Sequence, residues 1–108
     1  LSQAQETARI IGMISDSITY EELPFSQVII LIGGTQRGTV NTDEEGNYDI
    51  TVPAGIRFDL VFIAPDYPQR RITRLLLKEG DVIRLNIKMH NLQEEVIIEP
   101  WENKEITP

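Results

Sequence analysis

The 108-residue chain contains no cysteine, and it has only one histidine and one tryptophan. Without cysteine the chain can form neither a disulfide framework nor a thiolate metal site, so packing alone must hold its core together. No run of about 18 apolar residues occurs, and the sequence therefore predicts no membrane-spanning helix. Aromatic residues make up only 6% of the chain, which leaves few side chains for an exposed stacking platform.

Basic charge is also scarce. The chain has 10 lysines and arginines against 17 acidic residues, which gives a formal net charge of −7. This sign repels a polyanion, whereas nucleic-acid binding needs a basic surface that displaces counterions. The densest basic stretch is Arg70, Arg71 and Arg74, and we expect it to decorate one face of a strand. Nucleic acid is therefore not an expected partner.

Sequence motifs of catalysis are missing. The chain has no Gly-x-Ser-x-Gly elbow, no phosphate-binding loop and no His-Glu-x-x-His pair. A Ser-His-Asp arrangement would have to use His90, which follows the last predicted strand, and we expect this histidine to be an ordinary surface residue. The sequence thus predicts a protein that is not an enzyme and that uses no cofactor or metal.

A strand pattern dominates the rest of the chain. The hydrophobic share of 41% and the charged share of 25% are typical of a globular domain. Apolar side chains recur at every second position in several short stretches, with a turn signal between each pair. The predicted strands are residues 9–14, 28–32, 39–42, 48–52, 58–63, 69–77 and 83–89. Seven short strands at this spacing indicate an antiparallel sandwich or barrel.

The acidic turn at residues 43–47 is the candidate metal site. Oxygen-bearing side chains alternate there loosely as in a calcium loop, at Asp43, Glu45, Asn47 and Asp49. No bidentate glutamate follows at the required distance, and Gly46 before Tyr48 is typical of a tight turn that enters a strand. We therefore expect turn geometry rather than calcium binding.

Several motifs follow one another in an order that is typical of a known family. The first are Ile10-x-Gly12-x-Ile14-x-Asp16, Leu23-Pro24 and Val28-x-Ile30. The next are Gly38-Thr39-Val40-x-Thr42-Asp43, Gly46-x-Tyr48-x-Ile50-x-Val52 and Pro53-x-Gly55. The last are Leu60-x-Phe62, Tyr67 and Leu92-x-Glu94-Glu95-Val96-Ile97-Ile98. Over about residues 8–99 the chain resembles the carboxypeptidase regulatory-like domain. Asp66 departs from the family pattern, which has glycine before the tyrosine.

The resemblance implies an all-β, seven-stranded antiparallel Greek-key sandwich of the transthyretin (prealbumin) type. Such domains are accessory modules beside metallocarboxypeptidase catalytic domains and N-terminal periplasmic extensions of TonB-dependent outer-membrane nutrient receptors. The resemblance thus implies a non-catalytic interaction domain of an exported bacterial envelope protein, in the periplasm or associated with the outer membrane. Ser2 and Ala4 agree with export, because they fit the small-residue positions before a signal-peptidase site.

The chain divides into four predicted parts. These are a leader remnant or flexible segment (1–7), the sandwich (8–91), a β-prone extension (92–99) and a polar tail or linker (100–108). The candidate partner-binding residues lie in the extension and are Glu95, Val96, Ile97 and Ile98. Three interpretations stay open for this segment. It could pair with its own sheet as an eighth strand, which we favour, add to the edge of a partner's sheet, or serve as a linker.

Two alternative functions remain at this point. The first is a carbohydrate-binding sandwich, for which exposed aromatic side chains are needed. Tyr48, Phe58 and Phe62 fall on predicted core faces, while Tyr20, Tyr67 and Trp101 are scattered over a loop, a turn and the tail. A glycan platform is therefore not the first expectation. The second alternative is a stability domain attached to a peptidase.

Overall fold

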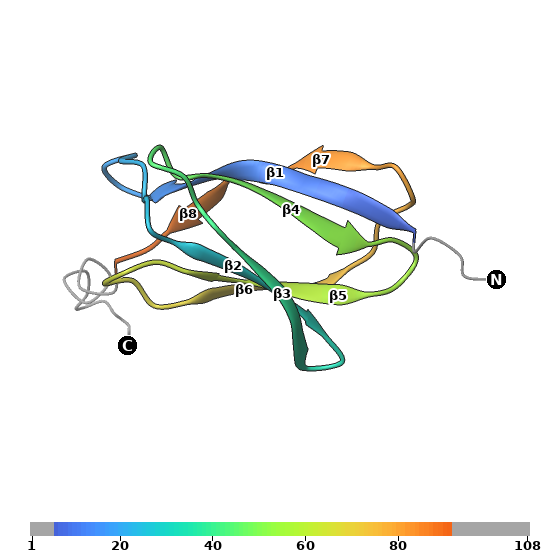
Figure 1. The fold of residues 1–108 in the computed structure, drawn as a ribbon. Coiled ribbons are helices and arrows are strands. Elements are labelled where there is room, and N and C mark those ends of the chain that lie inside the picture. Colours follow the sequence, from blue (N-terminus) through green and yellow to red (C-terminus); the bar gives the residue numbers. More distant parts are fainter. Residues whose placement is uncertain (1–5, 92–108) are drawn as a thin grey trace, which may run out of the picture.

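The protein is a two-layered β-sandwich. The computed structural model describes residues 6–91, and all their regular structure is extended (Figure 1). The strands are β1 (Thr7–Asp16), β2 (Gln27–Ile32), β3 (Thr35–Asn41), β4 (Asn47–Pro53), β5 (Phe58–Ile63), β6 (Arg70–Leu75), β7 (Val82–Arg84) and β8 (Ile87–Met89). No helix within the described range is long and apolar enough to cross a membrane. The predicted all-β sandwich is confirmed.

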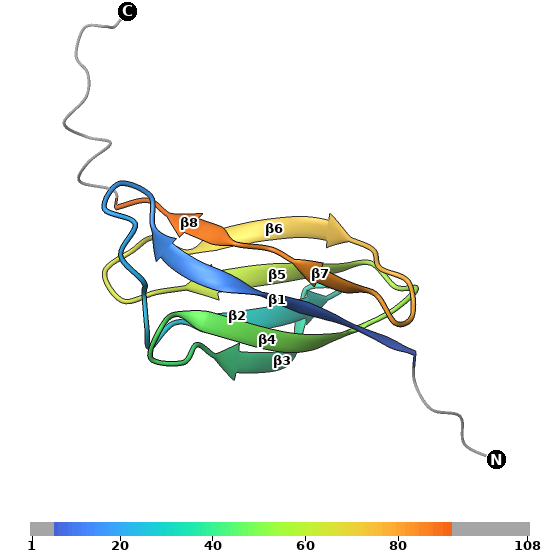
Figure 2. The same ribbon diagram turned by 90° about the horizontal axis from the view of Figure 1, so that it is seen from above.

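One sheet is built around β1. It has the order β4-β1-β7, and β8 also pairs with β1. β1 runs antiparallel to β4, with Ile10 opposite Ile50. β7 and β8 follow each other along the other side of β1, and both run parallel to it (Figure 2). The parallel pairs are possible because the chain passes through the whole second sheet between β1 and β7, which supplies the long crossover that parallel strands need.

The second sheet has the order β3-β2-β5-β6, and each neighbouring pair is antiparallel. Gly33 and Gly34, with φ angles of 60° and 83°, form the two-residue turn between β2 and β3. Positive φ at both positions is what a tight hairpin of this kind requires. The hairpin projects beyond the rest of the sandwich (Figure 1). Pairing of β3 begins at Thr35, four residues before the start of the predicted strand. The prediction missed residues 35–38 because they are polar and show no apolar alternation.

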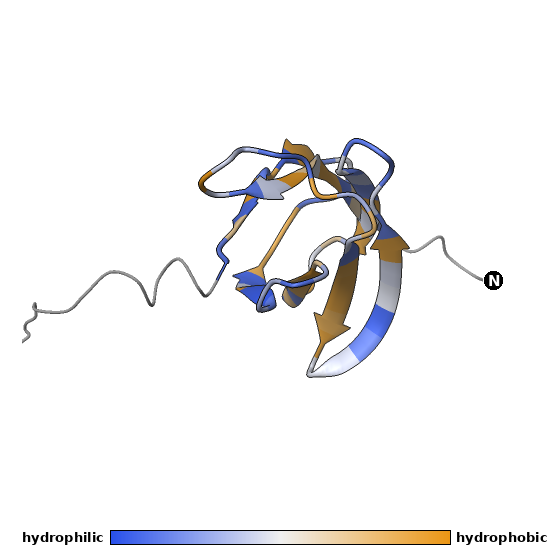
Figure 3. Cartoon of the chain, turned by 90° about the vertical axis from the view of Figure 1, so that its left-hand side faces the viewer, coloured by the Kyte–Doolittle hydropathy of each residue, from blue (hydrophilic) through white to orange (hydrophobic). Residues whose placement is uncertain are grey.

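The core lies between the sheets and contains the alternating side chains of the predicted strands. β5 contributes Phe58, Leu60 and Phe62, which are at most 2% exposed. Burial of a side chain of this size stabilises a fold by about 1.5–3 kcal/mol. The ring of Tyr48 meets that of Phe62 edge to face, with 5.8 Å between centroids. Hydrophobic residues accordingly concentrate on the strands, whereas β3 in the projecting hairpin is largely hydrophilic (Figure 3).

The most regular predicted strand, residues 83–89, is divided into β7 and β8. Its alternation is as predicted, since Ile87 and Met89 are buried and the residues on either side of each are exposed. At the break, the amide of Leu85 donates to the carbonyl of Ile11 at 2.8 Å. The division raises the number of strands within residues 6–91 from the predicted seven to eight.

Gly12 allows this break to pack tightly. A Cβ atom built on Gly12 would lie 2.1 Å from the carbonyl oxygen of Leu85. The same oxygen accepts a 2.5 Å hydrogen bond from the hydroxyl of Tyr48, and burial raises the pKa of that hydroxyl. The glycine of the first sequence motif therefore serves a close contact between β1 and the segment that joins β7 to β8.

Candidate functional site

The predicted partner-binding residues Glu95, Val96, Ile97 and Ile98 lie outside the described residues, as does Trp101. Their pairing, and the choice among the three interpretations of this segment, stays a prediction. The candidate surfaces of the sandwich itself come from its turns, its sheet edges and the loops at the end where β1 finishes.

In the acidic turn, the carboxylate of Asp43 serves the geometry of the turn itself. Asp43 accepts hydrogen bonds from the amides of Glu45 and Asn47, both at 2.9 Å, and these bonds hold the pKa of its carboxyl below the usual value. Asp49 forms an ion pair of 2.6 Å with Arg9 on the neighbouring strand. Within residues 6–91 no three His, Cys, Asp or Glu side chains are grouped so that they could hold a metal ion.

His90 is exposed, and its Nδ1 lies 3.0 Å from the hydroxyl of Ser17. A catalytic triad also needs a carboxylate that orients the imidazole. The nearby carboxylate of Asp16 is instead directed to the hydroxyl of Tyr67 and to backbone amides. The pair therefore differs from a triad.

The edge of the second sheet at β6 is protected by charge and by irregular backbone. Arg71 pairs with Asp59 at 2.6 Å, while Arg70 donates to the carbonyl of Lys88 at 2.8 Å. The two arginines thus leave the strand in different directions, which corrects the expectation of a single basic face. Arg74 has a φ of 62° beside a register shift. Charged side chains and bulges of this kind are devices that discourage an added strand.

The edge at β4 is more open. β4 pairs with β1 in one uninterrupted register over seven residues, and its one proline, Pro53, is the last of them. β3, an edge strand of the second sheet, pairs with β2 over a shorter uninterrupted stretch, because the register shifts at Arg37. β4 therefore presents the longest regular edge among the described strands.

Hydrogen bonds at both ends of the β1–β4 ladder define which peptide groups of β4 face outward. The amide of Ala54 donates to the carbonyl of Glu6 at 3.0 Å, and that of Ile14 donates to Gly46 at 2.9 Å. Bonded and non-bonded pairs alternate in an antiparallel ladder. The backbone N–H and C=O groups of Asp49 and Thr51 are therefore directed away from β1, toward the open edge.

A largely apolar groove of about 490 Å³ borders this edge between the two sheets. Both sheets contribute to its lining, which consists of Thr7, Ile30, Ile32, Arg37, Thr51, Val52, Pro53 and Ile56. A strand added to β4 would run along the mouth of this groove. Its alternate side chains could then bury apolar surface against Ile32 and Ile56, and Arg37 would favour an acidic neighbour.

At the far end of the sandwich, one buried carboxylate ties two loops together. Asp16 is 4% exposed. Its Oδ1 accepts from the amides of Ile18 (2.7 Å) and Thr19 (2.8 Å), and its Oδ2 accepts from the hydroxyl of Tyr67 (2.5 Å). These bonds, that of Tyr67 first, lower the pKa of Asp16 from 3.8 to about 2. Tyr67 also packs against the core and is partly buried, which removes it from a glycan platform.

The most unusual side chain of this end is Phe25. The residue is 81% exposed, and its φ is 62°. Left-handed backbone is rare for a bulky residue and costs on the order of 1–3 kcal/mol. The next residue holds it in place, because Ser26 is fully buried and bonds through its amide to the hydroxyl of Thr42 (3.0 Å) and through its hydroxyl to the carbonyl of Leu23 (2.9 Å).

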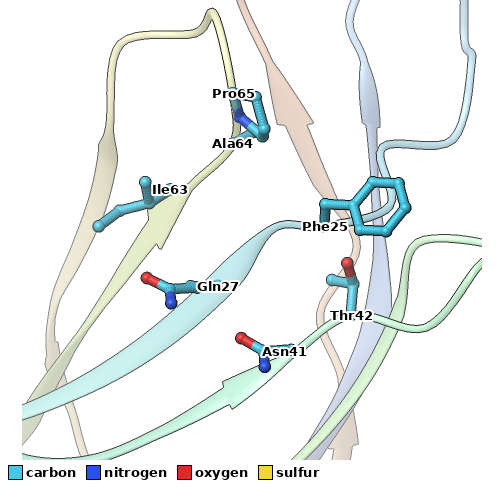
Figure 4. Close-up of a pocket in the computed structure, with 7 residues that line it drawn as sticks. All are labelled: Phe25, Gln27, Asn41, Thr42, Ile63, Ala64 and Pro65. Atoms are coloured by element: carbon cyan, nitrogen blue, oxygen red, sulfur yellow. The ribbon is translucent and has the colours of Figure 1, made fainter.

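Phe25 borders an open groove of about 540 Å³. The lining residues are Phe25, Gln27, Asn41, Thr42, Ile63, Ala64 and Pro65. Figure 4 shows Phe25 and Thr42 on one side, residues 63–65 on the other, and the two amide side chains between them. A second hollow of about 550 Å³ lies on the other side of Phe25 and is lined by Thr42, Asp43, Glu44 and Glu45.

Sequence patterns did not reveal Phe25. Tyr20 is indeed exposed, but the ammonium of Lys88 lies over its ring, 4.7 Å from the centroid. A phenylalanine directly after a proline, in a segment without strand periodicity, is the one signal that could have marked position 25. Its exposure, however, depends on hydrogen bonds to Thr42, which is distant in the sequence.

The fold has relatives among solved structures, although the chain matches no family model and no curated protein. The TIE protein of Bacillus anthracis has a TM-score of 0.65 and 18% identity, over 80% of this chain and 18% of that one. A "putative carbohydrate binding protein" of Bacteroides uniformis has a TM-score of 0.60 and 21% identity, over 76% and 40%. GBS52, the minor pilin of Streptococcus agalactiae, has a TM-score of 0.51 and 12% identity, over 94% and 49%.

These similarities concern the fold. The chain spans less than half the length of each of the three structures. In each case the shared part is a β-sandwich unit within a longer chain.

Proposed function

We propose that this chain is a non-catalytic accessory domain of an exported bacterial envelope protein and that it binds a protein partner through a sheet edge. The parent protein we propose is a TonB-dependent nutrient receptor with this sandwich as its N-terminal periplasmic extension. The ordered motifs that resemble the carboxypeptidase regulatory-like domain support this assignment. The three similar structures support only the accessory-domain part of the proposal, because each contains the sandwich as one unit of a longer bacterial protein.

The observation that carries the proposal is the open edge of β4. Within residues 6–91 no strand pairs with the outward peptide groups of Asp49 and Thr51, and pairing of such groups with an extended segment is the usual basis of recognition by strand addition. The groove beside them offers apolar surface to the side chains of that segment. Backbone pairing would supply affinity, and the groove would supply selectivity.

The experiment titrates the 15N-labelled domain with the periplasmic domain of TonB and follows amide exchange. We expect the amides of Asp49 and Thr51 to become protected in the complex. Thr51→Pro removes one outward donor without removing a bond to β1, and it should weaken binding at least about tenfold. The matched control is Thr39→Pro on the edge strand of the other sheet. The amide of Thr42 donates to the carbonyl of Ser26. Because bonded and non-bonded pairs alternate along the ladder, the amide of Thr39 is directed away from β2, as that of Thr51 is directed away from β1.

Two results would contradict the proposal. One is the absence of binding, and the other is an equal loss of affinity in Thr51→Pro and Thr39→Pro. The envelope location is tested separately by fractionating cells that make the complete protein, which should appear with the outer membrane. Recovery in the cytoplasm would contradict it.

Carbohydrate recognition is the second candidate function. The exposed Phe25 favours it, because sugars are bound by stacking on an exposed aromatic ring and by hydrogen bonds to polar side chains such as the amides beside it. The similarity to the Bacteroides uniformis protein supports the same candidate. The third alternative, a stability domain of a peptidase, would be supported by a zinc-peptidase domain in the same protein.

A further inference from the structure

The position of Phe25 is fixed without benefit to the core. The bonds of Ser26 hold the backbone on its C-terminal side, and the amide of Thr42 donates in return to the carbonyl of Ser26 at 2.9 Å. Hydrophobic residues normally lower the free energy of a fold by burial, yet Phe25 is 81% exposed. Tyr20 has similar backbone geometry, but its ring is covered by the ammonium of Lys88. Exposure of the Phe25 side chain in unfavourable backbone geometry therefore indicates a binding role.

A row of neutral polar and aliphatic side chains lies beside the ring. Gln27 is directly opposite Asn41 on β3 and directly opposite Ile63 on β5. Residues opposite each other in antiparallel strands place their side chains on the same face of the sheet. Figure 4 shows the two amides next to each other on the floor of the groove. Each side-chain amide has hydrogen-bond donors and an acceptor, so the two amides together can bind adjacent hydroxyl groups of one ligand.

Charge restricts the ligand further. Among the described residues no charged side chain lines the groove with the amides, whereas Asp43, Glu44 and Glu45 line the hollow beyond Phe25. An anionic ligand such as a phosphate ester or a uronic acid would be repelled by these carboxylates. A cationic side chain would be attracted to the acidic hollow, but the described lining of the groove that contains the two amides offers it no carboxylate. A neutral ligand with hydroxyl groups and one apolar face suits both hollows.

We propose that Phe25 is the stacking residue of a binding site for a chain of neutral pyranose sugars. One sugar ring would lie against the face of Phe25, its hydroxyl groups bonded to Gln27 and Asn41. The next would extend over Thr42 toward the acidic hollow, where the carboxylates of Glu44 and Glu45 would accept hydrogen bonds from its hydroxyl groups. The groove of about 540 Å³ lies within the usual range for small-ligand sites. This inference rests on the second candidate function, and it is independent of the β4 edge.

The test titrates the 15N-labelled domain with neutral oligosaccharides, namely linear hexamers of β-1,4-linked glucose, mannose and xylose, each up to about 10 mM. An oligogalacturonate and a tetralysine peptide serve as anionic and cationic probes. We expect at least one neutral hexamer to bind, with shifts confined to Phe25, Gln27, Asn41, Thr42 and their neighbours. Neither charged probe should produce these shifts.

Variants assign the binding to the ring. Phe25→Ala should lower affinity at least about tenfold, and Phe25→Tyr should keep it within about threefold. The matched control is Tyr20→Ala, which removes an exposed aromatic ring of the same loop with a similar φ of 63°. It should leave affinity unchanged, as should Thr51→Pro at the β4 edge.

Three outcomes would overturn the inference. They are the failure of all three hexamers to bind, equal affinity of the domain and of Phe25→Ala, and preferential binding of tetralysine at Phe25. The last would assign the site to a cationic peptide. None of them affects the TonB titration, so failure of the sugar site and failure of the edge proposal can be told apart.

Discussion

The hydroxyl of Tyr67 donates a 2.5 Å hydrogen bond to the carboxylate of Asp16. This bond joins the loop after β5 to the end of β1, and thus links the two sheets at the end that carries Phe25. Asp16 also fixes the amides of Ile18 and Thr19 at the start of the next loop. The shape of this end therefore depends on one tyrosine and one aspartate from different layers.

Removal of the tyrosine hydroxyl tests this link. Tyr67→Phe keeps the ring but leaves Oδ2 of Asp16 without its strongest partner. We expect Tm to fall by about 4–8 °C, the shift that one lost hydrogen bond produces in a domain of this size. Thermal unfolding followed by circular dichroism measures it. The control is Tyr20→Phe. It removes a hydroxyl from an exposed loop, and the Tm of this variant should equal that of the unaltered domain. Equal values for Tyr67→Phe and the unaltered domain would contradict the prediction.

Stability should also fall in acid because of Asp16. Its pKa is about 2 in the fold and ordinarily 3.8. A group whose pKa is lowered by folding binds fewer protons in the folded state, so its contribution is complete above the ordinary pKa and is lost as the pH falls toward the folded one. The loss attributable to Asp16 should therefore occur between about pH 4 and pH 2.

Asp16→Asn separates this contribution from those of other carboxylates. Asp43, Asp49 and Asp59 also have lowered pKa values, so the unaltered domain loses stability in acid for several reasons. Urea unfolding at a series of pH values should show a shallower decline between pH 4 and pH 2 in Asp16→Asn. Parallel curves for the two proteins would show that Asp16 is not responsible.

The alternation of side chains was enough to predict the core. Phe58, Leu60 and Phe62 are buried as expected, because a strand with one inner face has a strict period of two. The division of the last strand could not be predicted in this way. It depends on the contact of Leu85 with Gly12, and the local sequence at 83–89 is regular through the break.

That contact leads to a prediction about the first motif. Gly12→Ala would bring a Cβ atom to 2.1 Å from the backbone oxygen of Leu85, and backbone cannot move aside as a flexible side chain can. We expect the free energy of unfolding to fall by more than about 2 kcal/mol. Gly38→Ala is the matched control, since its Cβ would meet only Ile30 at 3.5 Å, an ordinary contact. A Gly12→Ala domain as stable as Gly38→Ala would contradict the prediction.

Less of the functional surface than of the core could be predicted. Asp43 and His90 were expected to serve a turn and the surface, and their contacts agree with that. Phe25 was missed because its exposure is imposed by residues distant in sequence. The open edge of β4 was missed because alternation shows which side chains are buried but not which peptide groups are left unpaired.

Replacing Phe25 with glycine tests whether the backbone at this position is strained. With a φ of 62°, any residue with a Cβ is less favourable there than glycine. We expect Phe25→Gly to be more stable than Phe25→Ala by about 1 kcal/mol, although glycine ordinarily destabilises relative to alanine because it loses more conformational entropy on folding. Urea unfolding of the two variants measures the difference. Greater stability of Phe25→Ala would show that the backbone relaxes, and the ring would then not be held in place for a ligand.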